Sequence, residues 1–413
     1  MNIANQVKRA PLPDGLRHLA GELMDVDSHE MMPAQVWVRE CGPIAERLAH
    51  DWLSNGTDVS TNINNPNVPG YDRDDAPIDA DSIWAQKGSI APGAVDVSRR
   101  DQIMDLMGIK RQLMFPTGVG MYGTMLAGSL EYDYGLSPSI TSNRKEYGRE
   151  LISAYNRWGM RAAGISARVR PALPVVSDTV AELMQTVREL ADNGIRAIWL
   201  PSGLPPGGKS PAHDDLDPFW RLMETKRIAV CLHGNAETVY RSDEWRKARA
   251  FEGFRIFEEI RVDPWSIANT HITSQNFLGT MVLGGVFDRH PDLRFGVIEL
   301  NGAWLGPLCD LLDMWYDTDP LGMKLGTEKS YRLPRRPSEY IKRNVRMSCF
   351  DFEPVDKYVT QYGLEDVLCF ASDYPHVEGG RNPISKWYQR LAPLGAHVVE
   401  KFFVTNGRWL LPD

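Results

Sequence analysis

Short apolar runs alternate with longer amphipathic stretches along most of the chain. Eight runs have the length of a strand, and each is rich in apolar residues up to its last positions. Parallel strands that helices cover on both faces read as near-continuous apolar runs, so this pattern predicts a parallel sheet with helices outside it. The predicted strands are Leu23–Asp27, Gln112–Phe115, Val169–Val175, Ala197–Leu200, Ile228–His233, Arg294–Glu299, Arg346–Phe350 and Val367–Ser372.

Helix signals stand between several of these runs. The stretch Thr179–Asn193 has apolar residues at helical spacing and is followed by a glycine that can end a helix. The stretch Pro218–Lys226 begins after Asp217, which can cap a helix, and proline suits a first turn. Eight strands in such an alternation predict a closed (β/α)8 TIM barrel. A doubly wound sheet is less favoured because the sequence has no glycine-rich dinucleotide or phosphate motif.

One segment interrupts the alternation. Residues 51–98 are rich in Asn, Pro, Gly and Asp and are much longer than a usual connection between a strand and a helix. The segment follows the first strand, so we expect it over the C-terminal mouth of the barrel, where an irregular insertion can act as a lid. Trp84 and Lys87 within it could reach a substrate, although a surface position is the simpler interpretation of each. We therefore predict one barrel domain over residues 1–413 with this insertion.

Composition and charge exclude several classes of function. Hydrophobic residues make up 43% of the chain and charged residues 24%, which is typical of a globular protein. The formal net charge of −8 argues against a nucleic-acid surface, which would be basic. The five cysteines form no CxxC pair, and no apolar stretch has the length of a membrane span or of a secretory leader. We expect a cytoplasmic protein that acts on a small molecule and binds neither nucleic acid nor membrane.

Titratable residues stand at the C-terminal ends of four predicted strands. Along the first of these strands, period-two alternation puts Asp25, Asp27 and His29 on one side. Each position alone has a plainer interpretation, as a capping aspartate or a hydrogen-bonded core histidine. Together they favour a metal site, because barrel active sites are built at this end of the strands. The residues at the four ends are Asp27 and His29, His233, Glu299, and Asp373.

These motifs resemble those of the amidohydrolase superfamily, in particular the amidohydrolase-related branch that includes aminocarboxymuconate-semialdehyde and resorcylate-type decarboxylases. The stretches "MDVDSH", "AVCLHGN" and "ASDYPH" are similar to the metal motifs of the first, fifth and eighth strands of that branch. The stretch "GVFDRHPDLRFGVIELNGAWLGPLCDLLD" resembles the segment that leads into its sixth-strand site. The resemblance runs from Asp25 to about Asn406 and implies a TIM barrel, a metal-dependent enzyme and a homodimer.

The resemblance also implies one divalent metal ion. Histidine and carboxylate ligands suit Zn²⁺ best here, with Mn²⁺ or Fe²⁺ as alternatives. The fourth strand, "AIWLPSG", has no lysine that could be carbamylated to bridge two metal ions. Two positions depart from the family pattern: Asp27 stands where the superfamily commonly has histidine, and Glu299 stands where the decarboxylases usually have a catalytic histidine. The implied metal ligands are Asp27, His29, His233 and Asp373.

Three further histidine and carboxylate positions are candidates for catalysis beside Asp373. Glu299 is one of them, at the end of the sixth strand. His271 could replace the missing sixth-strand histidine, or it could be a surface or capping residue. His376 is held near Asp373 by a proline and could orient that aspartate or contact the substrate. The guanidinium of Arg381 could pair with a substrate carboxylate.

Three functions remain open. The preferred one is a hydrolase that acts on a small cyclic or aromatic carboxylate through metal-activated water, with Asp373 as the base. The alternative is a non-oxidative, metal-dependent decarboxylase of a hydroxybenzoate-like acid, in which protonated Asp373 gives its proton to carbon. The replacement of histidine by Glu299 favours hydrolysis over decarboxylation. A metal-free, non-enzymatic barrel protein is disfavoured because every implied ligand position has a residue that can bind metal.

Overall fold

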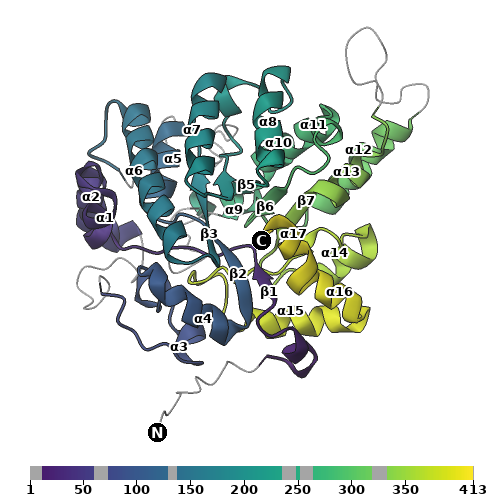
Figure 1. Cartoon of the computed structure of the whole chain (residues 1–413), viewed down its shortest axis with the longest axis horizontal. Coiled ribbons are helices and arrows are strands. Elements are labelled where there is room, and N and C mark those ends of the chain that lie inside the picture. The colour runs from purple at the N-terminus through teal and green to yellow at the C-terminus, as the bar shows by residue number, and fades with distance from the viewer. Residues whose placement is uncertain are drawn as a thin grey trace.

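A computed structural model describes residues 12–59, 73–128, 137–234, 248–251, 264–318 and 333–412. Eight parallel strands lie in chain order, and each pairs with the next. Figure 1 shows helices arranged around these strands. The predicted (β/α)8 barrel is therefore confirmed. The strands are β1 (Leu23–Asp25), β2 (Ile109–Met114), β3 (Val169–Pro174), β4 (Ala197–Trp199), β5 (Ala229–His233), β6 (Phe295–Ile298), β7 (Val345–Ser348) and β8 (Leu368–Cys369).

The first and last strands meet at hydrogen bonds just beyond their regular ends. The amide of Val26 donates to the carbonyl of Phe370 at 3.1 Å, and the amide of Asp373 donates to the carbonyl of Asp27 at 2.9 Å. An isolated parallel bridge also joins Ser28 to Tyr374. These contacts are sparser than a continuous ladder, which explains why β1 and β8 end earlier than the apolar runs predict. They also bring the polar residues that follow the two strands together.

Helices cover the outside of the barrel and account for the predicted amphipathic stretches. The helix predicted over Thr179–Asn193 is α7, and Thr179 caps it by accepting a hydrogen bond from the amide of Glu182 at 3.2 Å. The C-terminal helix α17 lies against β1, β7 and β8. The helices are α1 (Ala34–Cys41), α2 (Glu46–Val59), α3 (Ser82–Ala85), α4 (Arg100–Met107), α5 (Val119–Gly128), α6 (Arg144–Ile165), α7 (Val180–Asp192), α8 (Asp217–Thr225), α9 (Pro264–Ala268), α10 (Ile272–Leu283), α11 (Val286–Arg289), α12 (Leu305–Asp317), α13 (Pro337–Asn344), α14 (Val355–Tyr362), α15 (Pro383–Leu391), α16 (Ala396–Glu400) and α17 (Asn406–Leu410).

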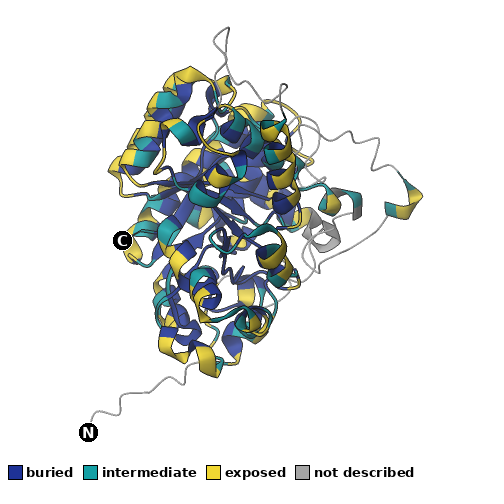
Figure 2. Ribbon diagram, turned by 90° about the vertical axis from the view of Figure 1, so that its right-hand side faces the viewer, coloured by how far each residue is buried: buried dark blue, intermediate teal, exposed yellow. Residues whose placement is uncertain are grey.

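The core fills the space between the strands and the helices, as the burial colours of Figure 2 show. Large aromatic side chains such as Trp199, Trp220 and Trp387 are fully buried in it. All five cysteines are free and buried, as expected for residues that serve as small core side chains. Within the described residues, no helix has the length and apolar character needed to cross a membrane.

The insertion predicted over residues 51–98 differs from the expectation in its first part. Residues 51–59 complete helix α2, so the start of the segment is helical, and residues 60–72 lie outside the described residues. The remainder carries the short helix α3 and docks on the loop after β8, because the amide of Gly88 donates to the carbonyl of Pro375 at 2.9 Å. The role of the segment as a lid stays a prediction, as does the extent of one domain over the whole chain.

Candidate metal centre

The side chains of the β1 motif point into the mouth of the barrel. Asp27 and His29 follow β1 directly and are almost completely buried. The backbone at His29 is held from two sides: its amide donates to the carbonyl of Tyr374 at 2.7 Å, and its carbonyl accepts from the buried guanidinium of Arg100. The motif therefore presents its side chains from a backbone that neighbouring elements fix in place.

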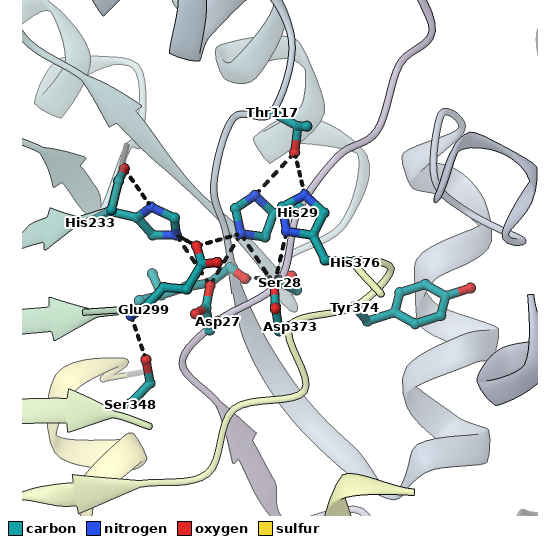
Figure 3. A network of polar contacts seen from close by, with 12 residues as sticks. Asp27, Ser28, His29, Thr117, His233, Glu299, Ser348, Asp373, Tyr374 and His376 are labelled. Carbon is teal, nitrogen blue, oxygen red and sulfur yellow. Dashed lines mark hydrogen bonds and ion pairs between the residues drawn. The ribbon is translucent and has the colours of Figure 1, made fainter. Parts of the chain in front are cut away.

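The expected ligands from β1, β5 and β8 meet at one point (Figure 3). The Nε2 atom of His29 lies 3.4 Å from Asp27 Oδ1 and 3.5 Å from Asp373 Oδ1. The Nε2 atom of His233 lies 3.6 Å from Asp27 Oδ1. The sequence places these four residues at three strand ends, and the barrel brings them into one cluster.

Glu299 belongs to the same cluster. Its Oε2 atom lies 3.1 Å from His233 Nε2 and 3.8 Å from His29 Nε2. Two sets of potential ligand atoms each lie within 4.8 Å of one another, and Glu299 and His29 are in both sets. The first set adds Asp27 and His233, and the second adds Asp373 and His376. Glu299 thus lies among the potential ligand atoms, although it is not one of the four ligands that the resemblance implies.

The buried atoms of this cluster fit a divalent cation. Asp27 Oδ1, His29 Nε2 and His233 Nε2 make no hydrogen bond to any of the described residues, although all three are buried. Buried polar atoms are normally hydrogen-bonded, so three converging exceptions require an explanation. Imidazole nitrogens and carboxylate oxygens at one point are the donors that Zn²⁺, Mn²⁺ and Fe²⁺ accept. Asp27, His29, His233, Glu299 and Asp373 are the residues that could hold such an ion.

The protonation of the cluster also suits a cation. Burial lowers the pKa of His29 well below its usual value, and the neighbouring His376 lowers it further, so the ring is neutral. Burial raises the pKa of Asp27, but contacts with His233 and His29 outweigh burial and lower it to about 2. Neutral imidazole and ionised carboxylate are the forms that bind metal. The Nδ1–H group of His233 donates to the carbonyl of Gly234 at 3.3 Å, which leaves its Nε2 lone pair facing the cluster.

Two of the carboxylates come from turns in the left-handed region of backbone conformation. The φ angle is 55° at Glu299 and 49° at Asp373. Residues other than glycine rarely adopt this conformation, and it concentrates at functional sites. Glu299 is held there by its amide, which donates to Ser348 Oγ at 2.8 Å. The strand ends therefore turn sharply, and each turn directs a carboxylate towards the histidines.

A small cavity lies against the carboxylates of the cluster, on the side of the loops after β7 and β8. Asp27, Glu299 and Asp373 line it, and its volume is about 10 Å³. This is about the space that one water molecule needs. A larger cavity of about 630 Å³ lies beside the start of α6 and the loops after β3 and β4, and none of the candidate site residues lines it.

His376 and His271 have different surroundings. The Nδ1 atom of His376 lies 3.1 Å from Asp373 Oδ1, as the sequence predicts. Burial lowers the pKa of His376, although the charges of Glu378 and Asp27 oppose this effect. His271 precedes α10, is stacked on Trp304 with 5.8 Å between ring centroids, and is in neither set of potential ligands. A catalytic role for His271 stays a prediction.

Thr117 is a residue of the site that no sequence motif indicates. It follows β2, and its Oγ1 atom lies 3.1 Å from His29 Nδ1 and 3.0 Å from His376 Nε2. The only sequence signal is its position just after a predicted strand, because "FPTG" matches no metal or catalytic motif. Thr117 would have been among the candidates if every polar residue just after a predicted strand had been considered, whether or not it can bind metal.

Residues 147–412 match the model of the amidohydrolase family. The chain belongs to the amidohydrolase family. The resemblance predicted from the metal motifs is therefore confirmed, and with it the expectation of an enzyme of the hydrolase or carboxy-lyase type. No curated protein matches this amidohydrolase in sequence.

Solved structures share the fold of this amidohydrolase over nearly its whole length. An amidohydrolase from Mycobacterium avium subsp. paratuberculosis is 20% identical with a TM-score of 0.62, and the match covers 95% of this chain and 98% of that one. The 5-carboxyvanillate decarboxylase from Sphingomonas paucimobilis is 17% identical with a TM-score of 0.56, covering 94% and 98%. A 5-carboxyvanillate decarboxylase from Novosphingobium aromaticivorans, complexed with manganese and 4-hydroxy-3-methoxy-5-nitrobenzoic acid, is 18% identical with a TM-score of 0.54, covering 98% of each chain. At these identities, the likeness shows a common fold.

Proposed function

We propose that the protein is a non-oxidative, metal-dependent decarboxylase of a hydroxybenzoate-like carboxylic acid. The observation that carries the proposal is Asp373, a buried carboxyl group that belongs to the metal cluster and lies 3.1 Å from the ring of His376. Such a group can move a proton at a carbon atom bound beside the metal. The fold shared with two decarboxylases of a hydroxylated benzoate supports this choice of substrate.

The position of Glu299 changes the balance between the two reactions. The sequence favoured hydrolysis because Glu299 stands where the decarboxylases usually have a catalytic histidine. Its Oε2 atom lies 3.1 Å from His233 Nε2, within a set of potential ligands. A carboxylate that binds the ion is compatible with decarboxylation. Because the shared fold supports a decarboxylase, we place this reaction ahead of hydrolysis.

A divalent cation in the cluster would supply positive charge that binds the substrate carboxylate and an adjacent ring oxygen. Zn²⁺ fits the donor atoms, and the manganese in a structural neighbour makes Mn²⁺ an equal candidate. Asp27, His29, His233 and Glu299 would hold the ion. The neutral ring of His29 and the ionised Asp27 need no change of protonation before it binds. The homodimer and the cytoplasmic location stay predictions.

Asp373 carries the proton in this proposal. Its protonated carboxyl group donates to the ring carbon that bears the substrate carboxylate. The bond between these two carbons then breaks, its electron pair stays on the ring and restores aromaticity, and CO₂ leaves. Asp373 is left ionised and takes a proton from solvent before the next turnover. His376 Nδ1 lies 3.1 Å from Asp373 Oδ1 and can orient the carboxyl group throughout.

The two reactions can be distinguished by which atoms of labelled water enter the product. We would incubate the protein, loaded with Zn²⁺ or Mn²⁺, with a panel of hydroxybenzoates, 5-carboxyvanillate, lactones and amides. A decarboxylase releases CO₂ and, in D₂O, leaves one deuterium on the carbon that lost the carboxylate. A hydrolase instead incorporates ¹⁸O from labelled water into its product. Incorporation of ¹⁸O without CO₂ release would reject the proposal in favour of hydrolysis, which the likeness to the mycobacterial amidohydrolase supports.

The role of Asp373 predicts a specific variant. We expect Asp373→Asn to lower kcat by about 10³-fold, because an amide cannot give up the proton. The cluster would still bind metal through its other members, so most Zn²⁺ affinity should remain in calorimetry. Asp366→Asn is the matched control: Asp366 lies at the other end of β8, where it pairs with Lys401 at 2.8 Å, and its loss should leave kcat unchanged. Near-normal turnover of Asp373→Asn would remove Asp373 from this role.

A further inference from the structure

The hydroxyl group of Thr117 connects the metal cluster to His376. It lies between two imidazole rings, 3.1 Å from His29 Nδ1 and 3.0 Å from His376 Nε2 (Figure 3). The two rings are stacked, with 3.8 Å between their centroids and 25° between their planes. The backbone of Thr117 is held by Glu30, whose Oε1 accepts from its amide at 3.0 Å. The hydroxyl group is therefore fixed in position between the rings.

The count of hydrogen atoms limits what this arrangement can do. A hydroxyl group has one hydrogen to donate, and a neutral imidazole donates from one nitrogen and accepts at the other. Thr117 can therefore donate to only one of the two rings. If it donates to His376 Nε2, then His29 can bond to it only by donating from Nδ1. If it donates to His29 Nδ1, then His376 can bond to it only by donating from Nε2. The tautomers of His29 and His376 are coupled through one oxygen atom.

Metal ligation by His29 sets the direction of this coupling. The Nε2 atom of His29 faces the cluster and lies 3.4 Å from Asp27 Oδ1, so it is the atom that would bind the ion. Ligation requires the lone pair on Nε2, which puts the hydrogen on Nδ1, where it is donated to Thr117. The hydroxyl hydrogen of Thr117 is then free for His376 Nε2, and when Thr117 donates it there, the hydrogen of His376 lies on Nδ1, 3.1 Å from Asp373 Oδ1.

Without an ion the opposite direction is available. Nε2–H of His29 can then point at Asp27 Oδ1, and its Nδ1 accepts from Thr117. His376 must in that case donate from Nε2 to the oxygen of Thr117. Its Nδ1 lone pair then faces Asp373 Oδ1, so His376 no longer donates a hydrogen bond to the aspartate.

We propose that Thr117 is a positioning residue that transmits metal ligation at His29 to the tautomer of His376. In the loaded protein, Nδ1–H of His376 is directed at Asp373 Oδ1, and in the metal-free protein it is not. The carboxyl group that moves the proton is therefore oriented only when the metal is bound. The inference rests on the metal site of the proposed function and holds for either reaction at that site.

The tautomers are observable by NMR. We would label the histidines with ¹⁵N and record long-range ¹H–¹⁵N correlations at about pH 8, where imidazoles are neutral. Spectra with and without Zn²⁺, which is diamagnetic, would be compared for the wild type, Thr117→Val and Thr117→Ser, and the His376→Gln spectrum assigns the resonance. We expect Zn²⁺ to move the hydrogen of His376 to Nδ1 in the wild type and in Thr117→Ser. In Thr117→Val the hydrogen should stay where it was, while the His29 resonances still respond.

Thr117→Val and Thr117→Ser also separate positioning from folding. Valine matches threonine in shape and removes only the hydroxyl group, and serine keeps it. We expect Thr117→Val to lower kcat by about 10- to 100-fold with little change in KM, as for the loss of other outer partners of metal ligands, and Thr117→Ser to restore it. A loss of kcat shared by both variants would mark a packing effect and overturn the inference.

The outcomes distinguish this inference from the proposed function. If Zn²⁺ leaves the His29 and His233 resonances of the wild type unchanged, the metal site fails and both proposals fail with it. If those resonances respond but the His376 hydrogen stays on Nε2, only the coupling through Thr117 is overturned. The same follows if Thr117→Val shows the wild-type response of His376.

Discussion

At the scale of single residues, Asp25 joins the strands that carry the metal ligands. Its buried carboxylate accepts from the amide and hydroxyl of Ser372 at 2.8 and 2.6 Å, and from Gln112 Nε2 at 3.1 Å. It thereby ties β1 to β2 and to the segment after β8. We expect Asp25→Ala to lower the free energy of unfolding by about 3 kcal/mol, because it leaves several buried donors without an acceptor. Asp25→Asn should cost less, since the amide keeps one acceptor and the shape.

Urea unfolding followed by fluorescence measures both changes. The exposed Asp192, the last residue of α7, provides the control, and Asp192→Ala should alter stability by less than about 0.5 kcal/mol. A loss below about 1 kcal/mol in Asp25→Ala would show that this carboxylate does not hold the strands together.

The site residues that end a parallel strand were predictable from the sequence, because the barrel brings the C-terminal ends of its strands together. Asp27, His233 and Asp373 each end an apolar run, and the C-terminal ends of parallel strands meet at one edge, so their convergence followed from the strand pattern. Thr117 was not predictable in this way. A lone hydroxyl has many uses, and its role depends on two rings that stand 88 and 259 residues from it in the chain. The place of Glu299 among the ligand atoms depended on a turn that the sequence did not indicate.

At the scale of elements, helices α5 and α6 pack closely through glycine. A Cβ atom on Gly148 of α6 would lie 2.4 Å from the amide nitrogen of Ala127 and 2.6 Å from the carbonyl oxygen of Gly123, both in α5. Backbone atoms cannot move aside, so Gly148→Ala would push the helices apart. We expect it to lower the free energy of unfolding by about 1–3 kcal/mol, as overpacked cores do.

Gly164 provides a matched control in the same helix. A Cβ atom there would meet nothing within 4 Å. Gly164→Ala should therefore raise stability by up to about 1 kcal/mol, because alanine favours the helix over the unfolded chain. Opposite signs for the two substitutions in thermal unfolding would support the close contact. Equal effects would contradict it.

The contact between α5 and α6 also shows what the sequence pattern left out at this scale. Helix α7 has a polar face and a buried face, and its boundaries were predicted to within a residue. Helix α5 is buried on nearly all sides and has no such alternation. Periodicity therefore located the helices that face solvent, whereas the burial of α5 depends on how α6 lies across it. The same holds for residues 51–59, whose polar composition favoured a loop although they complete α2.

At the scale of the whole molecule, metal binding should be visible as stability. The cluster gathers Asp27, Glu299 and Asp373 around His29 and His233 at the mouth of the barrel. The unfolded chain cannot reproduce this arrangement, so an ion that binds the native state shifts the folding equilibrium towards it. At a free metal concentration of 100 times Kd the gain is about 2.7 kcal/mol. We expect Zn²⁺ to raise the midpoint of thermal unfolding of chelator-treated protein by several degrees, and Mg²⁺ to raise it less, because imidazole ligands favour Zn²⁺.

The histidine of β5 decides whether this gain comes from the cluster. His233 Nε2 lies 3.6 Å from Asp27 Oδ1 and 3.1 Å from Glu299 Oε2, so His233→Ala removes a ligand from the middle of the set. The variant should lose most of the Zn²⁺-dependent gain in the thermal midpoint, whatever its stability without metal. His397→Ala removes an exposed histidine of α16 and should keep the full gain. An equal gain in both variants would place the bound Zn²⁺ elsewhere on the protein, because the response would then be independent of the strand ends that meet at the barrel mouth.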